Sequence, residues 1–251
     1  MSKHIKITTQ DRVTTVRIAR PEKKNAITQD MYAAMAAAIL DYSDKDDARA
    51  LIITGEGDMF TAGNDLHDFP TEDQEGEPTS VQFLNALRDC PKVVIAAVNG
   101  PAIGIGLTLL LHCDLVYARD TATFSAPFVK LGLVPEAGSS MLLPRAVGPA
   151  VANDVFLAGR TLSAEEAHQY GLAARVISGD TFDASVGDIA SRIAATAPSA
   201  LRHSKSLIRH QRQTLSEQML AEDDIFAEQL SSPDFTESIA AMMEKRPPVY
   251  S

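Results

Sequence analysis

The sequence predicts an α/β protein whose helices pack outside short buried strands, with a helical C-terminal region. Residues 50–54 and 93–98 are apolar and uncharged, the pattern of strands that are buried on both faces. Segments with helical spacing alternate with these strands, which favours a layered α/β architecture. From about residue 182 the spacing stays helical almost to the end of the chain.

Apolar alternation and turn residues define the N-terminal elements. Residues 5–18 alternate on either side of a turn near residues 10–11, which predicts a two-stranded hairpin. Thr28 precedes a segment rich in alanine and methionine, which predicts a helix over residues 29–42. Residues 67–80 contain five acids, two prolines and one glycine without an apolar period, so we expect a mobile surface loop there.

The rest of the chain adds further strand and helix units. We expect a helix over 81–89, a strand over 93–98, a helix over 103–112 and a strand over 114–118. Ser163 and Glu166 form a Ser-x-x-Glu capping box that opens a helix, and Gly171 closes it. Helix breaks fall near Pro198 and at Ser232-Pro233. We therefore predict a core over residues 1–195 and a helical region over 196–251 that serves assembly.

Composition limits the classes of partner. The net charge of −10 leaves no basic stripe for nucleic acid, and the apolar runs of the chain, such as residues 107–111 with their single threonine, are far too short to span a membrane. The first ten residues lack the apolar core of a signal peptide, so we expect a cytoplasmic protein. Cys90 and Cys113 lie outside any metal-binding spacing, so we expect buried thiols and neither a disulfide nor a metal site.

A dinucleotide site is one alternative. Gly104 and Gly106 follow a predicted strand and precede a helix, and Asp120 stands where a ribose-binding acid would. The third glycine of that motif is missing, because Leu109 occupies its place, and Pro101 interrupts the turn. Close helix packing explains the glycines better than a nicotinamide cofactor does.

Glu136 is the strongest candidate for acid–base chemistry. It is a lone carboxylate in an apolar stretch, and burial there would raise its pKa toward the range useful for proton transfer. An exposed loop glutamate is the alternative. Ser139 and Ser140 do not form a nucleophile elbow. The histidines show no paired spacing, and we expect surface or packing roles for each of them: His4, His67, His112, His168, His203 and His210.

Four stretches together resemble the crotonase superfamily, the enoyl-CoA hydratases and isomerases. They begin at Arg20 (RPEKKNA), Phe60 (FTAGNDL), Ala97 (AVNGPAIG) and Thr123 (TFSAPFVKLG, running into PEAG). The resemblance covers nearly the whole chain and holds in order and spacing. It implies a spiral of ββα units with a helical C-terminal trimerisation region, a homotrimer or dimer of trimers, and an acyl-CoA thioester as ligand.

The resemblance also implies a set of site residues. The N–H groups of Asn64 and Ile105 would hold the thioester oxygen, although Ile105 replaces the glycine usual in hydratases. The coenzyme A part of the substrate would contact Lys24, Ala26, Ala62, Asn64, Leu66 and Lys245. No metal and no separate cofactor are implied, because coenzyme A is part of the substrate.

The carboxylates favour one branch of the family. Thr108 and Phe128 stand where the hydratases carry their two glutamates, and Glu136 matches the single glutamate of the Δ3,Δ2-enoyl-CoA isomerases. We therefore predict an enoyl-CoA isomerase with one proton-carrying group. The alternatives are a hydratase or another acyl-CoA lyase or hydrolase of the same fold, a non-catalytic acyl-CoA-binding protein, and a nicotinamide-dependent dehydrogenase.

Overall fold

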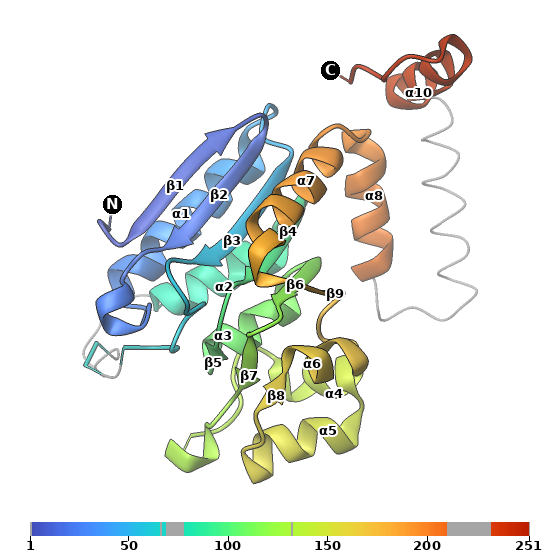
Figure 1. Cartoon of the computed structure of the whole chain (residues 1–251). Helices are drawn as coiled ribbons and strands as arrows, with labels where there is room; N and C mark the ends of the chain where they lie inside the picture. Colours follow the sequence, from blue (N-terminus) through green and yellow to red (C-terminus); the bar gives the residue numbers. More distant parts are fainter. Residues whose placement is uncertain (1, 66, 69–77, 132, 210–231, 251) are drawn as a thin grey trace.

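The computed structural model describes residues 2–65, 67–68, 78–131, 133–209 and 232–250, and within these the predicted α/β class is confirmed (Figure 1). The main sheet has the strand order β1-β2-β3-β4-β6-β9. Its first two strands form the antiparallel hairpin expected from residues 5–18, and the other neighbours pair in parallel. The strands are β1 (Ile5–Gln10), β2 (Val13–Ile18), β3 (Ala50–Gly55), β4 (Val93–Val98), β6 (Leu115–Arg119) and β9 (Arg175–Ile177).

Helices cover both faces of the main sheet because its strands are apolar on both sides. On β3, Leu51 and Ile53 join the core under α1 (Gln29–Asp44) and α2 (Thr79–Asp89). The alternate residues of β3, Ala50 and Ile52, pack with α7 (Phe182–Ala194) on the opposite face. This alternation follows from the period of two along a strand.

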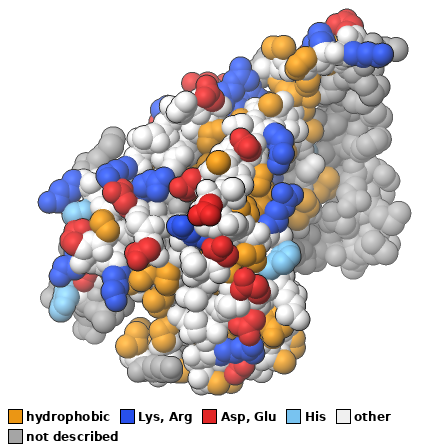
Figure 2. All heavy atoms as spheres, in the orientation of Figure 1, with side chains coloured by type: hydrophobic (Ala, Val, Ile, Leu, Met, Phe, Trp, Pro, Cys, Tyr) orange, Lys and Arg blue, Asp and Glu red, His pale blue; other side chains and the backbone are white. Residues whose placement is uncertain are grey.

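A second, smaller lobe contains a three-stranded sheet, β5 (Ala102–Ile103), β7 (Thr123–Ser125) and β8 (Leu162–Ser163). Its helices are α4 (Ser139–Val147), α5 (Pro149–Asn153) and α6 (Ala164–Gln169). Both interactions of the predicted capping box form at Ser163 and Glu166. Figure 2 shows hydrophobic side chains on the surface of this lobe, and the exposed large ones in this part of the chain are Val129, Leu131, Leu133, Val134, Met141 and Leu157.

Three further α-helices and several short helical turns complete the described structure. These α-helices are α3 (Ile105–Thr108), α8 (Pro198–Arg209) and α10 (Pro233–Glu244). The 3-10 turns are η1 (Pro21–Lys23), η2 (Leu109–His112), η3 (Val129–Leu131) and η5 (Gly179–Thr181), and η4 (Asp154–Ala158) is a π-helical turn.

The boundaries differ from the sequence expectation at several places. The helix expected over 103–112 begins only at Ile105, because Ile103 pairs with β7 and Gly104 takes a positive φ of 59°. Its last turn is a 3-10 turn, and the helix expected at residue 81 begins at Thr79. Most of the predicted surface loop, residues 69–77, lies outside the described residues, as does the segment 210–231 of the C-terminal region.

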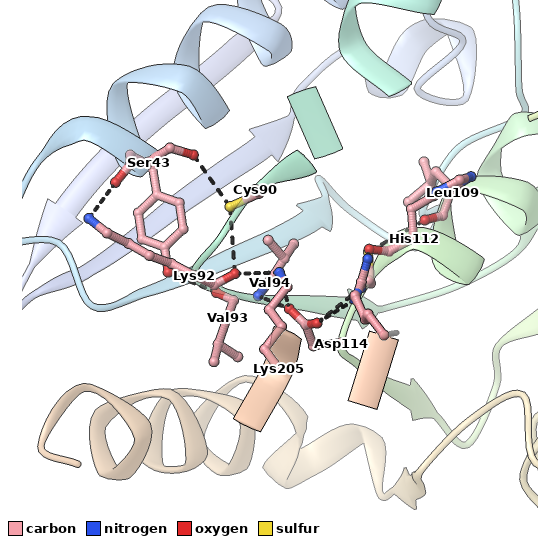
Figure 3. Close-up of polar contacts among 12 residues, drawn as sticks. Ser43, Cys90, Lys92, Val93, Val94, Leu109, His112, Asp114 and Lys205 are labelled. Atoms are coloured by element: carbon pink, nitrogen blue, oxygen red, sulfur yellow. Dashed lines mark hydrogen bonds and ion pairs between the residues drawn. The ribbon is translucent and has the colours of Figure 1, made fainter. Parts of the chain in front are cut away.

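Asp114 anchors α8 to the starts of the neighbouring strands β4 and β6 (Figure 3). Its carboxylate accepts from the backbone N–H of Val94 at 2.8 Å and pairs with the Lys205 ammonium at 2.8 Å. Arg209 pairs with the other carboxylate oxygen at 3.0 Å. The Lys205 side chain is only 7% exposed. Its charge is therefore almost shielded from water, and the carboxylate of Asp114 compensates it.

Two further expectations concern the cysteines and the membrane. Cys90 and Cys113 are both buried free thiols, as predicted. Among the described residues, no helix is long and apolar enough to cross a membrane.

Candidate active site

A cavity of about 380 Å³ lies where the segments that follow β3 and β4 meet. In open α/β sheets this end of the parallel strands is the usual place for a ligand. Four of the predicted site residues, Ala26, Ala62, Asn64 and Ile105, line it together. Phe128 also lines it and is 7% exposed, so one wall of the cavity is aromatic.

The loop that carries Asn64 is fixed from both sides. The carbonyl of Gly63 accepts from Ile27, and the N–H of Asp65 donates to the carbonyl of Ile27, each at 2.9 Å. Arg20 pairs with the Asp65 carboxylate at 2.6 Å, and both side chains are mostly buried. Between these contacts, the N–H of Asn64 has no acceptor among the described residues and is available to a ligand.

The second N–H belongs to Ile105, the first residue of α3. Gly104 precedes it with φ 59° and ψ −118°, a backbone conformation that glycine adopts and other residues avoid. Because a helix leaves its first N–H groups without intrahelical partners, the N–H of Ile105 is free. Within the described chain no other acceptor reaches it. Isoleucine in place of glycine at position 105 therefore keeps the backbone N–H as a donor.

Glu136 is held by the helix that begins with this second donor. The Thr108 hydroxyl donates to its Oε1 atom, and Thr108 stands three residues after Ile105, on the same face of α3. Glu136 is not among the residues that line the cavity, and its contact with Thr108 links it to the helix that carries the Ile105 donor. The alternative of an exposed loop glutamate is wrong, because Glu136 is half-buried.

Two carboxylates near the cavity have opposite electrostatic environments. Burial raises the pKa of Glu136 above its usual range, and the Thr108 hydroxyl offsets part of that rise. The hydrogen bond from Arg20 holds the pKa of Asp65 below its usual range. Of the two carboxylates, Glu136 is therefore the better suited to exchange a proton, whereas Asp65 is held in its ionised, paired form.

Tyr32 on α1 is a site residue that the sequence did not reveal. Its hydroxyl donates to the side-chain Oδ1 of Asn64, and its ring packs against Phe83 with centroids 5.6 Å apart. Burial raises the pKa of Tyr32, and the negative charge of Glu136 raises it further. Tyr32 thus lies near both Asn64 and Glu136 as a neutral hydroxyl. From the sequence, Tyr32 is only one residue of the helix predicted over residues 29–42.

The residues expected to contact coenzyme A are not all at the cavity. Lys24 is exposed and is not among the lining residues, whereas its neighbour Lys23 is; the backbone carbonyl of Lys24 accepts from Ala62. Lys245 is exposed just after α10 and does not line the cavity. Leu66 lies outside the described residues. In the part of the chain that is described, no cluster of His, Cys, Asp or Glu could hold a metal ion.

Known proteins resemble this chain over nearly all of its length. The family model described as Enoyl-CoA hydratase/isomerase matches residues 8–251. Enoyl-CoA delta isomerase 2 of Rattus norvegicus is 40% identical over 215 residues, a match that covers 83% of this chain and 55% of the rat protein. The chain thus spans about half the length of that relative.

Two similar proteins match this chain over nearly all or all of their own lengths. The 1,2-epoxyphenylacetyl-CoA isomerase of Escherichia coli strain K12 is 35% identical over 248 residues, covering 95% of each chain. The crystal structure of an enoyl-CoA hydratase/isomerase from Pseudoalteromonas atlantica T6c is 48% identical and superposes with a TM-score of 0.81, covering 99% of this chain and 100% of that one.

Proposed function

The chain belongs to the enoyl-CoA hydratase/isomerase family, and on that premise we propose that it is a Δ3,Δ2-enoyl-CoA isomerase. The observation that carries the proposal is one half-buried carboxylate, Glu136, held by Thr108 of the helix that begins with Ile105, together with two N–H groups that have no acceptor among the described residues. Thr108 and Phe128 occupy the positions where the resemblance places the glutamates of hydratases, and neither can activate a water molecule at neutral pH.

The reaction needs no group beyond these. The Glu136 carboxylate takes a proton from C2 of a 3-enoyl-CoA, and the C–H bonding electrons move into the bond between C1 and C2 while the thioester oxygen becomes negative. The N–H groups of Asn64 and Ile105 donate to that oxygen, each contributing about 3–4 kcal/mol to the stability of the transition state.

The second half of the reaction returns the same proton. As the thioester carbonyl re-forms, a double bond forms between C2 and C3, and the electrons of the former C3–C4 double bond take the proton from Glu136 at C4. The product is the conjugated 2-trans-enoyl-CoA, and Glu136 is again a carboxylate. The raised pKa of Glu136 favours this shuttle, because it reduces the difference in pKa between the Glu136 carboxyl and the weakly acidic C–H group at C2.

The contacts of the coenzyme A part remain part of the proposal. Ala26 and Ala62 border the cavity that also holds Asn64, which supports a thioester lying along these backbones. We assign Leu66, Lys24 and Lys245 to the same ligand, the lysines as point charges for phosphate. The Lys23 side chain at the cavity is a further candidate for that role.

A rate comparison tests the proposed reaction. Purified protein is given 3-enoyl-CoA and, separately, 2-trans-enoyl-CoA, and ultraviolet absorbance follows gain or loss of the conjugated thioester. We expect isomerisation, and hydration slower by about 10²-fold or more, because hydration lacks a positioned group to activate water. Comparable rates would favour a hydratase. Thioester binding by calorimetry without turnover would favour a non-catalytic binding protein.

We also propose that the chain assembles as a homotrimer or a dimer of trimers. The exposed apolar residues Val134, Met141 and Leu157 support this, since large apolar side chains on a surface mark interaction sites. That residues 196–251 contribute to the contact stays a prediction.

A further inference from the structure

Two side chains of the helical stretch formed by α3 and η2 contact two consecutive residues of the segment that follows η3. Thr108 donates to the side chain of Glu136, and His112, four residues later, contacts the backbone carbonyl of Ala137 through Nε2 at 2.8 Å. Ile105 and Thr108 belong to α3, and His112 ends η2, which follows α3 directly. The helical stretch that begins with the Ile105 N–H therefore also holds Glu136 and the residue after it.

Ala137 occupies a backbone conformation that needs support. Its φ is 56°, in the left-handed region that alanine seldom adopts, and Gly138 follows with φ 67°. Such a conformation persists when surrounding contacts fix it. The described contacts are the N–H of Ser139 donating to the carbonyl of Glu136 at 2.9 Å, and His112 on the carbonyl of Ala137.

The protonation of His112 follows from its partner. A backbone carbonyl only accepts, so Nε2 of the neutral ring carries the proton. Burial lowers the pKa of His112, and the charges of Arg209 on α8 and Arg88 on α2 lower it further, against the opposing effect of the Ala137 carbonyl. Arg209 also donates to the His112 carbonyl at 2.5 Å, which fixes the backbone that carries the ring.

We propose that His112 is a positioning residue for the reaction: by donating from Nε2 to the Ala137 carbonyl, it holds the left-handed turn that aims the Glu136 carboxylate. This inference rests on the proposed role of Glu136. His112 does not touch the substrate, and its effect reaches the reaction through the placement of one carboxylate. A surface or packing role, as expected from the sequence, would require no hydrogen-bond donor at this position.

Kinetic constants of matched variants test the proposal. His112→Leu keeps apolar volume without the donor, and His112→Gln keeps an N–H at a similar reach. We expect His112→Leu to lower kcat by about 10–100-fold, because small displacements of a catalytic group have effects of that size, and to leave KM near the wild-type value. His112→Gln should recover most of kcat.

His168 provides the matched control. Its Nδ1 atom contacts the carbonyl of Ala173 at 3.0 Å, a similar contact in the second lobe at the end of α6. His168→Ala should leave both kcat and KM unchanged. Unchanged kcat in His112→Leu would overturn the proposal, and so would a His112→Gln variant as slow as His112→Leu.

Crystal structures of the two His112 variants separate this inference from the proposed function. In His112→Leu, or in His112→Ala if the leucine variant does not fold, Ala137 should leave the left-handed region and the contact between Thr108 and Glu136 should break. Both features should persist in His112→Gln. An unchanged turn in the leucine or alanine variant would overturn the inference, even if the wild type proves inactive on 3-enoyl-CoA.

Discussion

At the scale of single residues, the hydroxyl of Thr108 carries the contact that most directly affects the acidity of Glu136. It donates to the carboxylate and so favours the ionised form, which lowers the pKa against the rise caused by burial. Since Glu136 acts first as a base, activity is lost as the pH falls through its pKa in the folded protein. The acid limb of the kcat/KM profile should therefore lie at a pH above the usual glutamate pKa of about 4.3.

Thr108→Val removes the donor at nearly constant volume. We expect the acid limb of the kcat/KM profile to move to higher pH, because the buried carboxylate then loses a group that stabilises its charge. Thr196→Val is the control, since that hydroxyl donates to the Arg192 carbonyl in an exposed position at the end of α7. A limb that stays in place or moves to lower pH would contradict the account.

The candidate site was only partly predictable at this scale. Asn64, Ile105 and Glu136 stand in motifs that are local in sequence, so the resemblance could assign them. Tyr32 and His112 could not be found in that way. Their partners, Asn64 and the backbone of Ala137, lie 32 and 25 residues away, and a carbonyl acceptor leaves no trace in the sequence.

At the scale of elements, Gly104 sets where α3 begins and where its first N–H points. A Cβ at position 104 would meet no atom within 4 Å, so the φ of 59° is the only obstacle to a side chain there. Gly104→Ala should therefore disturb the backbone itself and displace the Ile105 donor. We expect kcat/KM to fall by about 10²-fold, the effect of losing one donor to a developing oxyanion.

Gly187→Ala is the matched control for that substitution. Gly187 lies within α7, and a Cβ there would also meet no atom within 4 Å. Alanine should leave turnover unchanged and raise the free energy of unfolding by about 0.5–1 kcal/mol, because it favours a helix over glycine. If Gly104→Ala were as active as Gly187→Ala, the Ile105 donor would not have the proposed role.

The elements themselves were predictable in proportion to their length and periodicity. The hairpin, β3, β4, α1 and the capping box at Ser163 have strong local patterns, and the structure has each of them. The strands of the small sheet were not predicted, because they have only two or three residues and no alternation to detect. Their pairing depends on contacts between distant segments, as in β5 with β7.

At the scale of the whole molecule, the exposed apolar residues of the second lobe predict self-association. Light scattering should give three or six times the 27.0 kDa mass of one chain. Combined Val134→Asp and Leu157→Asp should shift the mass toward one chain, because these side chains are 77% and 71% exposed in the single chain and would be buried on assembly. Leu40→Asp, at an exposed position on α1, should leave the mass of the assembly unchanged. A wild type of single-chain mass would refute the proposed assembly.

The central claim is that Glu136 alone moves the proton. The most direct measurement compares the wild type with Glu136→Gln on 3-enoyl-CoA, following the conjugated thioester by ultraviolet absorbance. The amide keeps the shape and cannot act as a base, so kcat should fall by about 10²–10⁴-fold, while calorimetry should still detect binding of an acyl-CoA. A Glu136→Gln variant that isomerises within a few-fold of the wild-type rate would contradict the account.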